Sequence, residues 1–473
     1  MSTDTLLEEP ELSQSLRRLW VSPFNSWRYV IVWLILISPL LVRVWFLSKV
    51  PDIGEPFNID QFCLVEIPTG QNAFDHYREA SRLIGAIFKA KNSGASDDDH
   101  NAVIANGWSA ATDSLKAWLA DSREALAEWR LGTECPDALY FPFQELGSET
   151  EIPVISSLRA FTMIAQCEAA RLESNGDFAE AGKLYVASFR SSRHCGRHGD
   201  SSNRHYGCIL HFFSWNGLIH WAECPEVTAE QLRWALSEVR AADRMTEPLS
   251  ASLKADYVLA NNFFKRADWL EECGLAPGSF AKEPAVTGMR AYYWLIGEPQ
   301  ATLRVLRQAL VNQLNDVDKP LPERQPIAGT VAELLFQPDP NVPLKPNQLN
   351  PAALDRAFQR SNVTKQFAGV KSLEFSVARE RARQVTLEVA LAAQAYRRDH
   401  GEFPEDPVAL IPSYLDAWPV DPSHKTGQTI QYRRETPLSA IVWSLGNDGH
   451  DDGGDVSTDD RNPLDIGVPL KTR

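Results

Sequence analysis

The sequence predicts a mainly α-helical protein with an N-terminal transmembrane helix, an irregular helical bundle and a C-terminal α+β domain, in which a long helix lies on a small antiparallel sheet. Three observations predict this class: an uncharged apolar run near the N-terminus, apolar residues at three- and four-residue spacing through the middle, and short β-type segments near the C-terminus. Because 473 residues exceed one ordinary hydrophobic core, more than one folded unit is expected.

The first element is an apolar segment at 29–47, preceded by a tail at 1–28. No charge interrupts Tyr29–Val42, and the apolar character resumes after Arg43. At 1.5 Å per residue the segment covers about 28 Å, close to the hydrocarbon thickness of a bilayer. A cleaved signal peptide is the alternative, but its apolar core is shorter and small residues follow it, whereas bulky Trp45 lies here. We therefore expect a single-pass anchor.

The basic residues around this segment predict its orientation. Arg17, Arg18 and Arg28 precede it, and Arg43 and Lys49 flank its other end. Because the side with more Lys and Arg stays in the cytoplasm, the tail is predicted to be cytoplasmic and the body periplasmic or otherwise extracytoplasmic. The protein would then be a membrane protein of a bacterial envelope.

Residues 48–318 are predicted to form a helical domain. Leu158–Leu172 has the spacing of an amphipathic helix and ends at Asn175-Gly176-Asp177, after which Phe178–Phe189 gives a second helix. No 34-residue period repeats along the chain, so we predict an irregular bundle of helical hairpins rather than a repeat array. Its expected use is contact with another envelope protein. The proline-rich segment 319–371 is predicted to be a linker.

One group of possible metal ligands lies in the helical domain. It comprises His194, Cys195, His198, His205, Cys208 and His211. Imidazole and thiolate groups bind zinc or haem iron. However, the spacing matches no standard metal motif, and Arg193, Arg197 and Arg204 lie among these residues, where their charge repels a cation. A structural role is therefore favoured over a metal site.

Charge and motif content narrow the function. The net formal charge is -15 and no basic stripe is present, which disfavours a nucleic-acid-binding protein. The short motifs of nucleophilic hydrolases, nucleotide-binding enzymes and zinc proteases are missing, so we do not expect an enzyme. The alternative is a hydrolase or transition-metal enzyme with its site in the group from His194 to His211. The sequence predicts no particular small-molecule ligand.

The C-terminal domain is predicted at 372–473. A helix from Ser372 to Asp399 ends at Gly401, and strands are expected at Thr429–Arg433 and Ser439–Ser444. An acidic, glycine-rich segment follows the second of these strands. A long helix on a small antiparallel sheet is the physical interpretation of this pattern.

The order of short motifs in this domain is distinctive. It runs His400-Gly401-Glu402-Phe403-Pro404, Leu410, Tyr414-Leu415, Pro419-x-Asp421-Pro422, Tyr432 and Ser444-Leu445-Gly446-Asn447-Asp448-Gly449. Over residues 372–466 this order resembles the C-terminal domain of the type II secretion major pseudopilin. The resemblance implies a pilin-like fold, a relation to type II secretion and a bound calcium ion. The implied ligands are the backbone carbonyl of Leu445 and the side chains of Asp448, Asp455, Ser457 and Asp459. The anchor, helical region and terminal domain together also resemble large membrane-anchored envelope proteins of planctomycete-type bacteria.

The chemistry of the acidic segment agrees with calcium. Ca²⁺ takes about six to eight oxygen ligands on a flexible loop, and Asp448, Asp455 and Asp459 would supply three negative charges. The alternative is an acidic turn that is only solvated. Asp451 and Asp452 are expected outside the ligand set. The long helix departs from the pseudopilin pattern because it carries several charges and lies far from the membrane segment, which disfavours polymerisation into a pilus.

Overall fold

The computed structural model describes residues 27–48, 52–91, 97–143, 153–266, 269, 283–319, 323–324, 370–424, 427–446, 449–456 and 465–471. Within these residues the chain is mainly helical and has one three-stranded antiparallel sheet. The helices are α2 (Trp27–Leu47), α3 (Ile59–Cys63), α4 (Ala73–Lys91), α5 (Asp97–Asn106), η1 (Trp108–Ala110), α6 (Asp113–Asp121), α7 (Arg123–Glu134), α8 (Pro153–Ser174), α9 (Phe178–Gly196), α10 (Ser201–Glu223), α11 (Ala229–Asp243), α12 (Leu249–Lys265), α14 (Glu283–Leu295), α15 (Gln300–Leu314), α19 (Val370–His400) and η5 (Pro407–Leu410). The strands are β1 (Gln431–Thr436), β2 (Ser439–Ser444) and β3 (Ile466–Leu470). The mainly helical class with a small antiparallel sheet is confirmed.

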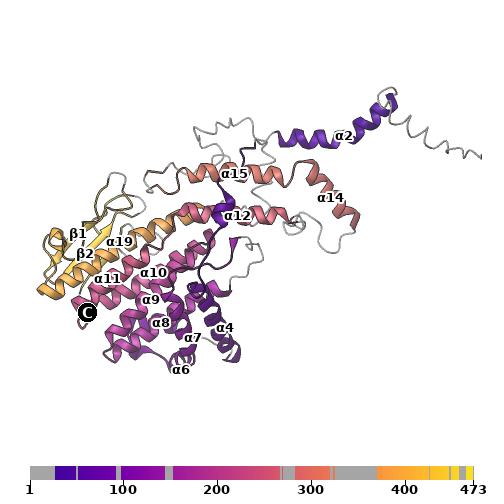
Figure 1. Cartoon of the computed structure of the whole chain (residues 1–473). Helices are drawn as coiled ribbons and strands as arrows, with labels where there is room; N and C mark the ends of the chain where they lie inside the picture. Colours follow the sequence, from indigo (N-terminus) through magenta and orange to yellow (C-terminus); the bar gives the residue numbers. More distant parts are fainter. Residues whose placement is uncertain are drawn as a thin grey trace, which may run out of the picture.

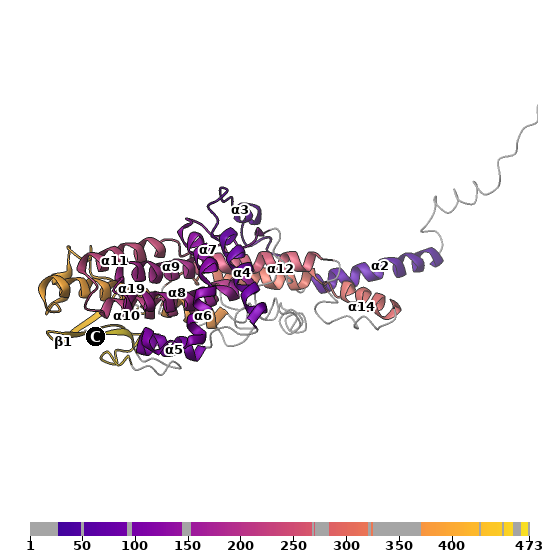
Figure 2. The same ribbon diagram turned by 90° about the horizontal axis from the view of Figure 1, so that it is seen from below.

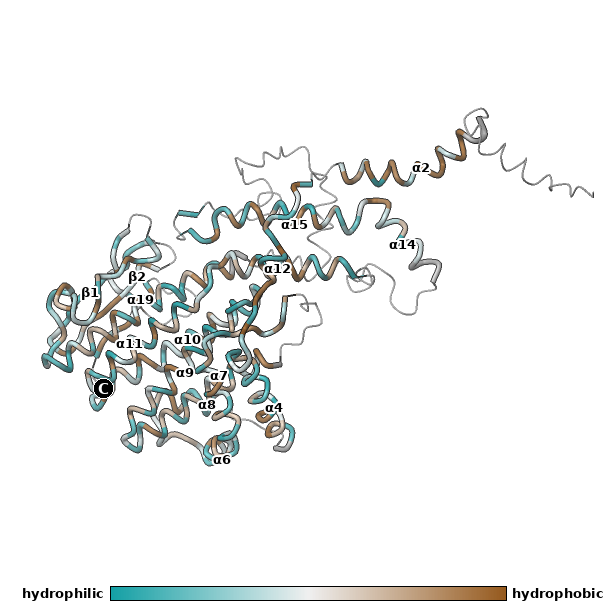
Figure 3. Tube along the Cα trace, viewed as in Figure 1, coloured by the Kyte–Doolittle hydropathy of each residue, from teal (hydrophilic) through white to brown (hydrophobic). Residues whose placement is uncertain are grey.

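The apolar N-terminal segment forms one helix, α2, which extends away from the rest of the chain (Figure 1). Apolar residues follow one another along its length (Figure 3). No residue between Val30 and Leu47 is fully buried by the body, although Phe46 and Leu47 are partly covered. In the described part of the chain, α2 is the helix that is long and apolar enough to cross a membrane, as its composition predicts.

The predicted hairpin in the middle of the chain is formed by α8 and α9. Gly176 has φ of +82° at the end of α8, a conformation that glycine adopts without steric cost. Asp177 then caps α9, because its carboxylate accepts a hydrogen bond from the Glu180 backbone N–H at 3.2 Å. Both helices are therefore bounded by local signals in the sequence.

Glycine residues bring α9 and α10 close together. A Cβ atom at Gly182 would lie 2.6 Å from the Trp221 ring, and one at Gly207 would lie 2.9 Å from the Ser192 carbonyl oxygen. These distances are shorter than ordinary van der Waals contacts, so the approach of the two helices requires glycine. The close contact matters for the charged residues described below.

The long helix α19 lies between the sheet and the helical body (Figure 1). One hydrophobic cluster joins Leu391 of α19 to Val442 and Val468 of the sheet and to Leu218 and Leu236 of α10 and α11. The sheet has the order β1-β2-β3, with Val442 opposite Val468. β3 was not predicted from the sequence.

The regions predicted as a helical domain and a C-terminal domain therefore share part of one core. The predicted linker, 319–371, lies almost entirely outside the described residues, so its boundaries stay a prediction. The tail before Trp27 also lies outside them. What the structure shows is that α19 contacts α10 and α11 along one side and the sheet along another.

Candidate functional site

The charged site of the body is centred on a carboxylate buried between α9, α10 and α19. Glu380 is 1% exposed, and it accepts hydrogen bonds from the guanidinium groups of Arg193 and Arg204. Arg204 Nη1 lies 3.0 Å from Glu380 Oε1. Burial by itself raises the pKa of Glu380, but the two guanidinium groups outweigh it and hold the pKa well below its usual range.

Local structure explains why the two arginines meet. Arg193 lies in the last turn of α9, Arg204 lies in the first turn of α10, and a short turn joins the two helices. Asp200 caps α10 by accepting a hydrogen bond from the Asn203 N–H at 2.8 Å. Both guanidinium groups therefore contact the same face of α19.

The network continues from Glu380 to α11 and along α19. Arg193 Nη2 donates to Gln384 Oε1 at 2.9 Å and lies 2.9 Å from Asp243 Oδ1. Gln384 in turn donates to Glu388 Oε1 at 2.9 Å. The charge of Arg193 is thus shared between carboxylates on two helices.

A pocket of about 460 Å³ opens beside this network. It is lined by Arg193, Asp243, Thr246, Glu247, Pro248, Glu380, Arg381, Gln384, Val385 and Pro422. Its volume is in the range of small-molecule sites in proteins, about 300–1,000 Å³. The lining combines an apolar wall of Pro248, Val385 and Pro422 with polar groups from α9, α11 and α19.

Arg381 differs from the other charged residues of this pocket. It is half-buried, and no hydrogen bond or ion pair of its guanidinium group is formed with the described residues. Arg193 and Arg381 line the pocket, and Arg204, outside the lining, pairs with Glu380. Arg193 and Arg204 together balance the two negative charges of Glu380 and Asp243. Arg381 therefore adds one positive charge to the pocket, since Glu247 pairs with His198.

Glu247 is neutralised by a histidine in the turn between α9 and α10. His198 Nδ1 lies 2.9 Å from Glu247, and His198 Nε2 lies 3.1 Å from Asp137. Burial lowers the pKa of His198, but the two carboxylates outweigh burial and raise it to about 9. His198 is therefore an imidazolium ion at neutral pH, and it fixes Glu247 at the pocket wall.

The other histidines of the predicted metal group have different surroundings. His194 Nδ1 lies 2.8 Å from the Tyr77 hydroxyl, and burial lowers its pKa to about 4. His211 is fully buried with its ring centroid 5.1 Å from that of Phe189, and burial lowers its pKa well below the usual value. Both are neutral core histidines at pH 7. His205 is half-buried.

The cysteines of the same group are buried thiols. Burial raises the pKa of Cys195, and it raises the pKa of Cys208 to about 12, so neither is a thiolate at neutral pH. Across the residues that the structure describes, no three side chains of His, Cys, Asp or Glu converge to hold a metal ion. The geometry thus agrees with structural roles for the group from His194 to His211.

The ligands implied for calcium fall only partly in the described residues. Leu445 and Asp455 are described, whereas Asp448, Ser457 and Asp459 lie outside the described residues. The Leu445 N–H donates to Asp421 Oδ2 at 2.8 Å, which fixes the start of the loop after β2. The geometry of the implied set therefore stays a prediction.

An aspartate that the sequence did not single out lies next to this loop. Asp465 is 1% exposed, and its Oδ2 accepts a hydrogen bond from the Gly454 N–H at 2.8 Å. Its Oδ1 is buried without a hydrogen-bond partner among the described residues, as is Asp452 Oδ2. Burial and the nearby charges of Asp451 and Asp452 raise the pKa of Asp465 to about 6. Its position directly before the apolar β3 is the sequence signal for its burial.

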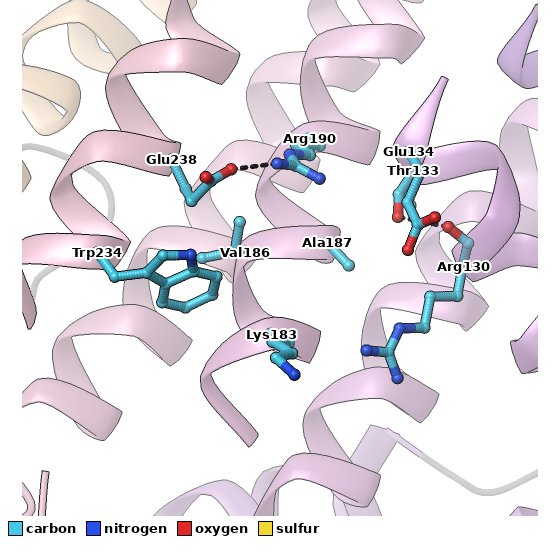
Figure 4. A pocket seen from close by; sticks show the side chains of 9 residues that line it. All are labelled: Arg130, Thr133, Glu134, Lys183, Val186, Ala187, Arg190, Trp234 and Glu238. Carbon is cyan, nitrogen blue, oxygen red and sulfur yellow. Dashed lines mark hydrogen bonds and ion pairs between the residues drawn. The ribbon is translucent and has the colours of Figure 1, made fainter. Parts of the chain in front are cut away.

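A second, smaller pocket lies between α7, α9 and α11 (Figure 4). Its volume is about 190 Å³, below the range typical of ligand sites. Its cations already have carboxylate partners: Arg190 pairs with Glu238, and Arg130 and Lys183 pair with Glu180. The larger pocket beside Glu380 is therefore the better candidate for binding.

Comparisons with known proteins give no template for either pocket: no family model, no curated protein and no solved structure matches the chain.

Proposed function

We propose that this chain is a membrane-anchored binding protein of a bacterial envelope, whose ligand is a small anion with an apolar part. The single observation that carries the ligand class is Arg381, a cation at a pocket whose other charged groups are paired. A guanidinium group offers a planar fork of N–H donors that matches a carboxylate or a phosphate. The wall of Pro248, Val385 and Pro422 would cover the apolar part.

The anchor in this proposal is α2. Its apolar residues from Val30 to Trp45 are exposed, a condition that is costly in water and favourable in a bilayer. The bias of basic residues towards the N-terminal side supports a body outside the cytoplasm. A relation to type II secretion follows from the resemblance of the C-terminal region, and contact with another envelope protein is the use expected of the helical domain. Both belong to the proposal.

The ligand class can be tested with three probes that differ only in their head group: octanoate, octylamine and octanol. Binding to the full-length protein in detergent is measured by calorimetry. Octanoate should bind, and Arg381→Gln should weaken its binding by about 10-fold or more, since a charged hydrogen bond contributes about 1.5–3 kcal/mol. Arg383→Gln is the matched control, because Arg383 lies on the same helix but stacks on Phe212 at 4.3 Å. Equal binding of octanol, or octanoate binding that survives Arg381→Gln, would show that the pocket does not select anions.

We propose in addition that the loop after β2 holds a calcium ion. The buried Oδ1 of Asp465 and Oδ2 of Asp452 are the observation in favour, because a buried carboxylate oxygen without a donor is stabilised by a cation. Asp465 would join the ligands that the resemblance implies, Leu445, Asp448, Asp455, Ser457 and Asp459. The ion would hold the loop against the sheet.

Thermal unfolding with and without millimolar CaCl₂ tests this site. The melting temperature of the full-length protein should rise with Ca²⁺, since binding to the folded state alone adds about 2.7 kcal/mol at a hundredfold excess over Kd. Asp465→Asn should remove the rise, and Asp416→Asn, at a side chain that is 96% exposed, should keep it. A rise of the same size in Asp465→Asn, or none in the unmodified protein, would refute the site.

A further inference from the structure

The end of α2 is fixed to two helices from much later in the sequence. The Arg43 guanidinium group donates to the Trp294 carbonyl oxygen and to Gln300 Oε1, and it lies 4.9 Å from the centroid of the Trp294 ring. Arg304 of α15 donates to the Leu47 carbonyl oxygen at 3.0 Å. The last turn of α2 is therefore attached to α14 and α15.

The contact surface also includes apolar groups. Tyr293 and Ile296 are buried, and they form a cluster with Phe46 of α2. Gly297 has φ of +96°, and a Cβ atom there would lie 3.0 Å from the Leu47 side chain. The close approach of the chain after α14 to α2 thus depends on a glycine. These contacts give α14 a defined position relative to α2.

That position is on the side of the body from which α2 extends. Figures 1 and 2 both place α14 beside the C-terminal part of α2, beyond the ends of α12 and α15 and at the opposite end from the sheet. If α2 crosses a bilayer, α14 lies at the level where the lipid headgroups meet the acyl chains.

The exposed side chains of α14 suit the boundary between membrane and water. Tyr292 is 52% exposed and Trp294 is 44% exposed, although both are large apolar residues. Trp45 on the adjoining end of α2 is 55% exposed. Tyrosine and tryptophan are enriched at the boundary between membrane and water, because their rings favour the acyl region and their polar atoms favour the headgroups. Three exposed aromatic rings thus gather where α2 would leave the bilayer.

We propose that α14 is a second membrane contact, a helix that lies in the headgroup layer, where Tyr292 and Trp294 flank the buried Tyr293 and reach the lipid on its two sides. This inference rests on the proposed membrane span of α2. Because α14 contacts α2 through Phe46 and Arg43, a bilayer that surrounds α2 would also reach α14. With two attachments, α2 and α14, the body would have a fixed orientation on the membrane. A single membrane-spanning helix would leave the body free to tilt.

A fluorescent label at an added cysteine tests the contact without removing either aromatic ring. Ala291→Cys lies on the exposed side of α14. The label is attached in a Cys273→Ser background. The other six cysteines are buried, which protects them from the label. Full-length protein labelled with an environment-sensitive nitrobenzoxadiazole group is reconstituted in phosphatidylcholine liposomes with or without doxyl-labelled lipid. Ala417→Cys, an exposed alanine before β1, is the matched control.

In liposomes the label at position 291 should emit at shorter wavelength than the same fluorophore in aqueous buffer, and doxyl lipid should quench its emission at least twofold. The label at position 417 should show neither change. Emission typical of water from position 291 in liposome-bound protein would overturn the proposal. So would a blue-shifted but unquenched signal, which would mean that protein covers α14. Flotation of the liposomes tests the anchor separately: protein that does not float lacks the span, and both proposals then fail.

Discussion

Glu380 and Asp465 are equally buried carboxylates, each 1% exposed, but they lie in opposite electrostatic surroundings. Glu380 lies between helices that deliver two guanidinium groups, and its pKa is lowered. Asp465 lies beside a loop that delivers further carboxylates, and its pKa is raised to about 6. Burial therefore does not decide the ionisation of a carboxylate in this protein. The charges on the neighbouring segments decide whether the carboxylate is ionised.

The two regions also differ in how a cation is supplied. The helical junction carries its own cations, Arg193 and Arg204, on the helices that form it. At the loop, Arg433 donates to the Gly453 carbonyl oxygen at 2.9 Å and stacks on Trp443, so its interactions stabilise the strand side of the loop rather than Asp465. A site that depends on an added ion can respond to that ion, whereas a site with internal cations cannot.

Removal of the Glu380 charge should have the largest effect. Glu380→Gln leaves two buried guanidinium groups without their shared counterion, and we expect a loss of about 3–5 kcal/mol in the free energy of unfolding. Urea unfolding of the full-length protein in detergent, followed by circular dichroism, measures it. A loss below about 1 kcal/mol would mean that water replaces the carboxylate.

His198 is the reverse case, a cation between two carboxylates, and its loss should have the next largest effect. Its pKa in the folded protein is about 9, above the unfolded value of about 6.5. The stabilisation is therefore complete below about pH 6.5 and is lost as the pH rises through 9. We expect about 2–3 kcal/mol less stability for His198→Gln at pH 6, and little difference at pH 10. Melting temperatures measured across this range check it, and a difference that does not change with pH would contradict it.

Asp465 should show a smaller effect of opposite sign. Because its pKa is raised to about 6 from an unfolded value of about 3.9, the folded state loses stability as the pH rises from about 4 through 6. Without calcium, Asp465→Asn should therefore stabilise the protein at pH 7.5 by about 1–2 kcal/mol and have little effect at pH 4. Unfolding at both pH values in a chelator measures it. Destabilisation at pH 7.5 would mean that Asp465 has a cationic partner.

The smallest effect is expected for an ion pair at the surface. Glu402 lies 2.6 Å from Arg434, and the Glu402 side chain is 52% exposed. Glu402→Gln should cost less than about 1 kcal/mol, and 0.5 M NaCl should reduce that difference further. The same unfolding measurement gives the reference against which Glu380→Gln is judged. A cost near that of Glu380→Gln would remove the distinction between buried and exposed pairs.

Most secondary structure of this chain follows from local sequence. The apolar run that forms α2, the hairpin of α8 and α9 with its turn at Gly176, and the long helix that ends at Gly401 were all predicted, because spacing and capping residues act within a few positions. β3 was not predicted. It is short and contains Pro469, which a strand tolerates because β3 pairs with β2 alone in the described sheet, so its outer edge needs no donor.

The sequence by itself determined the apolar helix, the helical body and the acidic loop, since each is encoded by neighbouring residues. The tertiary structure alone decided the candidate site: Glu380 meets Arg204 and Arg193 across separations of 176 and 187 positions, and the pocket beside Arg381 forms where α11 and α19 meet. It also decided that Asp465 is buried, with one carboxylate oxygen that has no hydrogen-bond partner among the described residues. Such contacts depend on how helices pack, and packing is set by the fit of whole surfaces rather than by spacing along the chain.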